Sequence, residues 1–261
     1  MFAYFRNRRR ARLRAQPFPE AWEPILHRRL LLWAKLTPAR REELRRRIQV
    51  FLAEKHFEGC GGLALNDDMR VTIAAHACAL TLGHEPEYYP GLASILVYPA
   101  AFMVHNDEPG ESGMVMEEPD VLEGESWCSG AVIFSWEDGR FDAAHADGRN
   151  VFYHEFAHQL FDRGLPGFRD NQQATQFAEV FGRHYVEHVQ AVDAGRRTSL
   201  DPYGAEHETE FFSVATEMFF EQPKRLALRH PELYAALCDY YRLDTGGPDK
   251  DRTDRHQPRT P

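Results

Sequence analysis

Two histidines one helical turn apart, with a glutamate directly after the first, are the residues of this sequence best suited to chemistry. They are His154, Glu155 and His158, in the stretch HEFAH. On an α-helix, residues i and i+4 project from one face, so both imidazoles can bind a single Zn²⁺ ion. Glu155 lies beside that face and can accept a proton from water that the metal activates. The pattern predicts a catalytic zinc site with His154 and His158 as ligands.

The site needs a third protein ligand, for which the sequence offers two candidates. Metzincins continue the motif with a glycine and a histidine, but those positions hold Phe161 and Gly164 here, so that class is excluded. A carboxylate on a later helix remains. Both Glu179 in QFAEVF and Glu210 in ETEFFSVATEMFF have apolar neighbours. Spacing alone leaves both candidates open.

A second, inverted histidine motif competes for the metal. The stretch HYVEH at 184–188 has the order of ligands found in inverzincins. Its neighbours Arg183, Gln190 and Asp193 indicate a more solvated helix face. The apolar flanks of the first motif suit a desolvated catalytic site better, so the inverted motif is the weaker alternative.

The first histidine pair requires a helix, and the sequence predicts one over residues 150–164. Asn150 can cap its first turn. The helix can be buried through apolar residues on both sides of the motif: Val151, Phe152, Leu160 and Phe161. Helical spacing of apolar residues predicts three more helices towards the C-terminus, over residues 171–195, 207–223 and 230–243.

The first hundred residues are also predicted to be mostly helical. One helix is expected over 37–57, with Thr37 as its N-cap and a proline in its first turn. Another is expected over 67–83, with Asp67 as its cap and Gly83 at its end.

Strand composition is confined to the middle of the chain. Residues 93–105 and 130–136 are rich in β-branched and aromatic side chains, whereas the acidic, glycine- and proline-rich stretch 106–126 is predicted to be a loop. Residues 245–261 offer no apolar anchor and are predicted to be disordered. The expected fold is a single α+β domain, mostly helical, with a small mixed sheet.

Several stretches resemble a known protein family. They are YHEFAHQLFD at 153–162, DPYGAEHETEFFSVATEMFFEQP at 201–223, GESWCSGAVIFSWED at 124–138 and ILVYPAAFMV at 95–104. In these stretches the sequence resembles the Mlc titration factor A family of zinc-dependent peptidases, whose catalytic region is similar to that of anthrax lethal factor. The likeness extends from about Arg40 to Leu243, with Phe161 in place of the more usual leucine.

The resemblance implies a zincin-like peptidase domain over residues 40–244, of the gluzincin type. It implies Glu210, rather than Glu179, as the third zinc ligand, and it places Tyr203 at the substrate. A phenol hydroxyl there can donate a hydrogen bond to the oxyanion that develops when a peptide carbonyl is attacked. Glu155 and Tyr203 are therefore the expected catalytic residues.

The resemblance also implies two functions. The first is zinc-dependent hydrolysis of peptide bonds, with aminopeptidase activity described in the family. The alternative is regulatory, because the family is named for binding the glucose-responsive repressor Mlc. A protein of this kind would sequester a transcriptional repressor, and its partners would be a peptide or protein substrate and a repressor resembling Mlc.

Two further hypotheses concern the surroundings of the zinc site. Glu217 lies two turns after Glu210 on the same helix face, where it can hold a ligand histidine through the second ring nitrogen. The strand at 130–136 directly precedes the zinc helix and is expected to lie at the edge of the sheet, where an extended peptide can pair with it.

Charge is unevenly distributed along the 261 residues. The net charge is −9, but residues 1–50 hold 14 basic and 4 acidic residues, a balance of +10, so the remainder carries −19. Residues 1–39 are therefore treated as a basic N-terminal segment. The acidic remainder argues against direct binding to nucleic acid.

Membrane insertion and secretion are not expected. The longest apolar stretch, 92–104, is shorter than the roughly 20 residues that a membrane span needs. No apolar region of the kind found in signal peptides follows the basic cluster near the N-terminus. The four cysteines are widely spaced, without a Cys-x-x-Cys pair. Together these features predict a cytoplasmic protein.

Overall fold

The computed structural model describes residues 2–86, 88–100, 102–103, 121–122, 124–127, 130–143 and 145–247. Its first half contains four helices, α1 (Phe2–Arg14), α2 (Glu23–Arg29), α3 (Pro38–Glu54) and α4 (Asp67–Leu80), and two 3₁₀ turns, η1 (Glu20–Trp22) and η2 (Leu31–Lys35). The strands are β1 (His56–Gly59), β2 (Ser94–Tyr98), β3 (Phe102–Met103), β4 (Val121–Leu122), β5 (Gly124–Trp127) and β6 (Ala131–Ser135). Most of the predicted loop and the tail from Pro248 lie outside the described residues.

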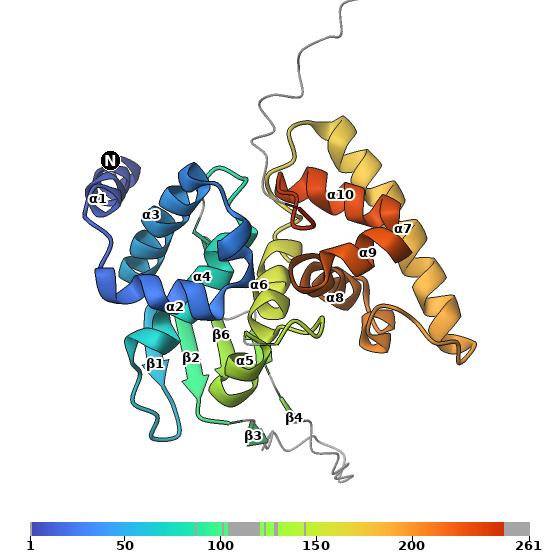
Figure 1. Ribbon diagram of the computed structural model, residues 1–261, viewed down its shortest axis with the longest axis horizontal. Helices are drawn as coiled ribbons and strands as arrows, with labels where there is room; N and C mark the ends of the chain where they lie inside the picture. The colour runs from blue at the N-terminus through green and yellow to red at the C-terminus, as the bar shows by residue number, and fades with distance from the viewer. Residues whose placement is uncertain are drawn as a thin grey trace, which may run out of the picture.

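The second half is helical. It contains α5 (Trp136–Asp142), α6 (Val151–Phe161), α7 (Asn171–Asp193), η3 (Pro202–Ala205), α8 (Glu208–Glu221), α9 (Pro223–Arg229) and α10 (Pro231–Tyr241). Figure 1 shows α6 between two groups of elements, with the sheet and the N-terminal helices on one side and α7 to α10 on the other. The predicted α+β fold with a small mixed sheet is confirmed.

Four strands form the larger sheet, in the order β1-β2-β6-β5. Strands β1, β2 and β6 run parallel, and β5 is antiparallel to β6. The expectation that the strand at 130–136 lies at an edge is therefore wrong, because β6 pairs with β2 on one side and β5 on the other. Strand β4 and all but the last residue of β5 lie within the stretch predicted to be a loop. The acidic, glycine-rich composition of that stretch gave no sign of strands, so this part of the prediction is wrong.

An aromatic cluster holds α6 against this sheet. The ring of Phe156 lies 5.6 Å from that of Phe134 on β6, 5.9 Å from Phe51 on α3 and 5.1 Å from Tyr89, measured between centroids. Phe152, one turn earlier, lies 5.1 Å from Phe134. All five side chains are buried. Because burying one such side chain stabilises by roughly 1.5–3 kcal/mol, this cluster fixes which face of α6 turns towards the sheet.

Polar side chains define where the helices begin. Thr37 caps α3 and Asn150 caps α6, as predicted, each accepting a hydrogen bond from a backbone N–H three residues on. Helix α4 differs, because its cap is Asn66 and not Asp67. It ends at Leu80, before Gly83. A Cβ at Gly83 would lie 2.1 Å from the carbonyl oxygen of Tyr241, so glycine here permits a close backbone approach rather than ending the helix.

Both ends of the described chain are bound to the body of the protein. Arg10 on α1 forms two hydrogen bonds with Glu54 on α3, of 2.8 and 2.7 Å. Thr245 is fully buried, its hydroxyl donates to the carbonyl of Phe219, and its own carbonyl accepts from Lys35. Disorder predicted from residue 245 onwards is therefore wrong for the first residue of that stretch. No helix in the described ranges is long and apolar enough to span a membrane.

A buried histidine makes the stability of this fold sensitive to pH. His76 on α4 is 1% exposed, and its ring lies 4.8 Å from that of Tyr153 and 5.2 Å from that of Phe152. Burial lowers the pKa of His76 to about 4, although the hydrogen bond to Thr72 opposes this. Below the unfolded pKa, near 6.5, the unfolded chain takes up a proton that the folded chain does not, so stability falls as the pH drops from about 6.5 to 4.

We expect His76→Gln to remove this dependence. Between pH 7.5 and pH 5.0 the native protein should lose about 2 kcal/mol of unfolding free energy through His76 alone, a loss that the variant is spared. Urea unfolding of both proteins at the two pH values measures the difference. Parallel pH profiles would contradict this account of His76.

Candidate metal centre

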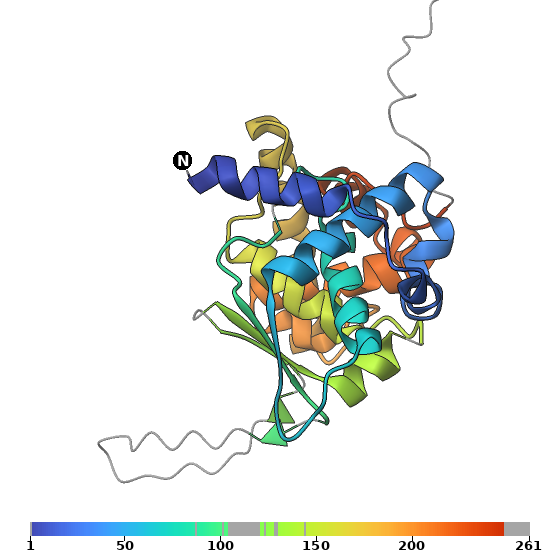
Figure 2. The ribbon, with the colours of Figure 1, turned by 90° about the vertical axis from the view of Figure 1, so that its left-hand side faces the viewer.

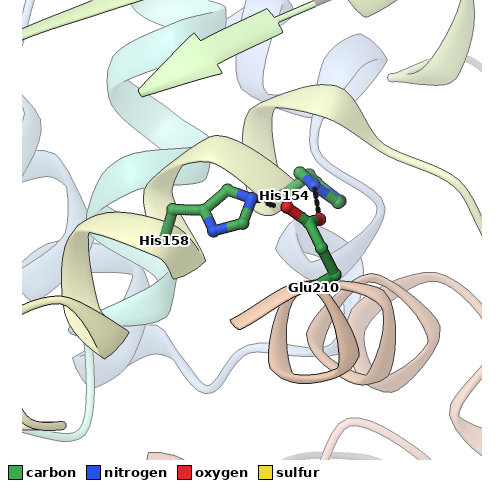
Figure 3. Close-up of side chains that lie close together, drawn as sticks. All are labelled: His154, His158 and Glu210. Carbon is green, nitrogen blue, oxygen red and sulfur yellow. Dashed lines mark hydrogen bonds and ion pairs between the residues drawn. The ribbon is translucent and has the colours of Figure 1, made fainter. Parts of the chain in front are cut away.

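Three side chains that could hold a metal ion converge between α6 and α8. His154 and His158 lie one turn apart on α6, and Glu210 points at both from the first turn of α8 (Figure 3). The Oε2 atom of Glu210 lies 3.0 Å from Nε2 of His154 and 3.4 Å from Nε2 of His158. Among the residues that the structure describes, no other group of three histidine, cysteine or acidic side chains brings its ligand atoms close enough together to hold one metal ion.

The donor set and its spacing suit a small divalent metal. One ligand atom from each of the three residues lies within 4.8 Å of the others. Tetrahedral zinc, with bonds of about 2.0–2.2 Å, places neighbouring ligand atoms roughly 3.3–3.5 Å apart, close to the distances from Glu210 to the two imidazoles. Two nitrogens and one carboxylate oxygen also match the ligand chemistry of catalytic zinc sites.

Helix geometry explains why the histidines face α8. Successive residues of an α-helix are rotated by about 100°, so a residue two positions from Phe152 or Phe156 points to nearly the opposite side. Because both phenylalanines face the sheet, His154 and His158 face α8, which packs against α6. Glu179, the other candidate ligand, is exposed on α7 and is not part of the cluster.

Glu217 contacts the side of His154 that faces away from Glu210. Its Oε1 lies 2.7 Å from Nδ1 of His154, and its Oε2 accepts a hydrogen bond of 2.5 Å from the backbone N–H of Asn150. The contact expected between Glu217 and a ligand histidine is therefore present. A proton held on Nδ1 by Glu217 leaves Nε2 available to a metal and fixes the orientation of the ring.

The contacts between Glu210 and the histidines shift the pKa values of both kinds of group. Burial favours the neutral form of Glu210, but hydrogen bonds from His154 and His158 outweigh it and lower the pKa of Glu210 to about 2. For His154 burial is likewise outweighed, by Glu217 and Glu210, and its pKa is raised well above 6.5. A metal that binds Nε2 of His154 must displace the proton on that nitrogen, so binding should release protons.

Glu155 lies at the same site but is not part of the ligand cluster. It is 4% exposed, and its Oε2 is buried without a hydrogen-bond partner among the described residues. Burial raises the pKa of Glu155 to about 7, against the opposing effect of His154 and His158. A buried carboxyl that changes charge near neutral pH suits proton transfer.

Tyr203 lies on the rim of this site, in the short turn η3. Asp201 caps the turn, its Oδ1 accepting from the backbone N–H of Tyr203 at 3.0 Å. The side chain of Tyr203 is 47% exposed, and its ring lies 6.1 Å from that of His154. All of the site residues predicted from sequence are therefore brought together: His154, Glu155, His158, Tyr203 and Glu210.

The inverted motif on α7 does not form a comparable cluster. His184 contacts the exposed Glu187 at 3.7 Å, between Nδ1 and Oε2. His188 is buried, and its Nε2 lies 3.0 Å from the carbonyl oxygen of Asp201. Sequence reasoning missed this contact with the turn of Tyr203, because the two residues meet only through the packing of α7 on η3.

Residues 5–242 match the family described as Glucose-regulated metallo-peptidase M90. The chain belongs to this family. M90 membership indicates a metallopeptidase and implies a bound metal ion, for which the cluster of His154, His158 and Glu210 supplies a fitting donor set.

Relatives of this M90 protein are similar over most of their length. An uncharacterized protein, slr2042, of Synechocystis sp. is 39% identical over 245 residues, covering 90% of this chain and 88% of the relative. Mlc titration factor A of Cronobacter sakazakii is 30% identical over 235 residues, 87% of each chain. The protein of the same name from Klebsiella pneumoniae is 31% identical over 237 residues, 85% of this chain and 86% of the relative. The family resemblance inferred from sequence is confirmed.

Removing the carboxylate behind His154 should weaken metal binding by this M90 protein. We expect Glu217→Ala to lower the affinity for zinc about 10–100-fold, because His154 loses the acceptor that orients it. Competition with a chromophoric chelator measures the affinity. Glu208→Ala is the matched control, since Glu208 is exposed on the same helix. Equal affinities in the two variants would show that Glu217 does not support the site.

Proposed function

We propose that this protein is a zinc-dependent peptidase of the gluzincin type, with His154, His158 and Glu210 as the zinc ligands. The observation that carries the proposal is the convergence of these three ligand atoms between α6 and α8. It is supported by membership of a metallopeptidase family and by Glu155, which lies in the zinc-binding HExxH pattern.

Three residues of the chain have separate roles in the proposed hydrolysis. When bound, zinc supplies a Lewis acid that polarises the peptide carbonyl and makes water more nucleophilic. Glu155 accepts the proton of the attacking water at its carboxylate and passes it to the leaving amine. The hydroxyl of Tyr203 donates a hydrogen bond to the oxyanion of the attacked carbonyl. Glu217 keeps His154 in the tautomer that presents Nε2.

A regulatory role is the second candidate, and the names of two relatives favour it. Both are called Mlc titration factor A. We propose that this chain also binds a transcriptional repressor resembling Mlc in the cytoplasm. From the family resemblance, we further propose that the zinc site acts as an aminopeptidase on short peptides.

Two substitutions separate catalysis from metal binding. Glu155→Gln should keep one zinc per chain and lower kcat by at least about 10²-fold, because an amide cannot accept the proton. Glu210→Ala should instead lose the metal. Elemental analysis and a panel of short fluorogenic peptides measure both effects. Full peptidase activity in Glu155→Gln would refute the mechanism.

The role of Tyr203 is tested by removing a single oxygen atom. Tyr203→Phe keeps the ring beside His154 but removes the donor to the oxyanion, so kcat should fall about 10²-fold while zinc content stays unchanged. Steady-state kinetics on the best peptide of the panel provide the measurement. An unaltered kcat would remove Tyr203 from the mechanism.

A further inference from the structure

A histidine of the inverted motif forms a hydrogen bond with the turn that carries Tyr203. His188 is 7% exposed on α7, and its ring lies 5.4 Å from that of Phe211, the residue next to Glu210 on α8. Its Nε2 lies 3.0 Å from the carbonyl oxygen of Asp201. A carbonyl only accepts, so Nε2 carries the proton and donates it. His188 thus links α7, α8 and the turn.

The hydrogen bond from His188 reaches the same carbonyl oxygen that closes the turn. The carbonyl of Asp201 also accepts from the backbone N–H of Gly204 at 3.1 Å, which closes the turn on itself. Pro202 has no N–H to contribute. The hydrogen bond from His188 therefore ties the residue at the start of the turn to α7.

Gly204 shows how closely the turn is seated. A Cβ at this position would lie 3.3 Å from Cα of Phe211 and 3.4 Å from Nε2 of His188, which is tighter than most contacts of real Cβ atoms. Glycine therefore lets the turn rest directly on His188 and on the first turn of α8. The side chain of Tyr203, by contrast, is half exposed and has its ring 6.1 Å from that of His154.

We propose that His188 is a positioning residue for Tyr203: its hydrogen bond to Asp201 fixes the turn from which the tyrosine hydroxyl reaches the substrate carbonyl. This inference rests on the proposed function of Tyr203 as an oxyanion donor. A misplacement of about 1 Å at a reacting group can cost about 10²-fold in rate, so one bond at the base of the turn can control turnover without touching the substrate.

Paired substitutions at position 188 test the bond itself. His188→Leu keeps an apolar side chain against Phe211 but removes the donor, and kcat should fall about tenfold or more, with KM and zinc content near those of the native protein. His188→Gln can again donate to Asp201 and should restore most of kcat. Glu187→Ala, exposed on the same helix, is the control and should change nothing.

A double-mutant cycle separates positioning from a general structural role. In the Tyr203→Phe background there is no hydroxyl to position, so His188→Leu should lower kcat by less than about twofold further. The same loss in both backgrounds, or loss of zinc, would overturn the positioning role alone. An unchanged kcat in Tyr203→Phe itself would overturn the proposed role of Tyr203, and the positioning role with it.

A second route to the same displacement avoids position 188. If His188→Leu does not fold, Gly204→Ala places a methyl group against Phe211 and His188 and pushes the turn away from both. It should lower kcat in the native background and have no further effect beside Tyr203→Phe. Equal losses in both backgrounds would again overturn the proposal.

Discussion

The packing of α6 between the sheet and α8 is the constraint on which the rest of the site depends. The aromatic face around Phe152 and Phe156 can be buried in only one orientation, against Phe134 and its neighbours. Once that face is fixed, the period of the helix points His154 and His158 at α8. Glu210 and Glu217 lie seven residues apart on α8 and meet His154 from two sides. The metal centre thus follows from hydrophobic packing.

Several carboxyl groups lie close together behind the histidines, and burial favours the uncharged form of two of them. Burial raises the pKa of Glu221 to about 8 and that of Asp142 to about 6. Burial therefore favours the protonated form of Glu221 at neutral pH, which limits repulsion beside Glu217. Asn150 connects the two, donating from its side chain to Glu221 and from its backbone to Glu217. The residue that caps α6 also orders the carboxyl groups supporting its first histidine.

Local signals in the sequence were sufficient for much of the fold and the site. The caps Thr37 and Asn150 and the spacing of His154 and His158 depend only on neighbouring residues, and the structure contains them as expected. Long-range pairing was not predictable in the same way. The composition of the strand at 130–136 suits either an edge or the centre of a sheet. It lies inside the sheet because β5, in an acidic and glycine-rich stretch, pairs with its second side.

The third ligand also could not be chosen from local sequence signals. Glu179 and Glu210 both sit among apolar neighbours in the sequence, and only the packing of α8 on α6 brings one of them to the histidines. The family resemblance implied Glu210, and Glu210 is the residue that lies beside the histidines. The contact of His188 with Asp201 had no sequence signal at all, because the two residues are thirteen positions apart and lie in different elements.

Crystallography of the zinc-loaded protein at the zinc absorption edge tests the central claim most directly. The account predicts one strong anomalous peak between α6 and α8, about 2.0–2.2 Å from Nε2 of His154, Nε2 of His158 and a carboxylate oxygen of Glu210. A peak beside the histidines of α7, with none between these three side chains, would contradict it.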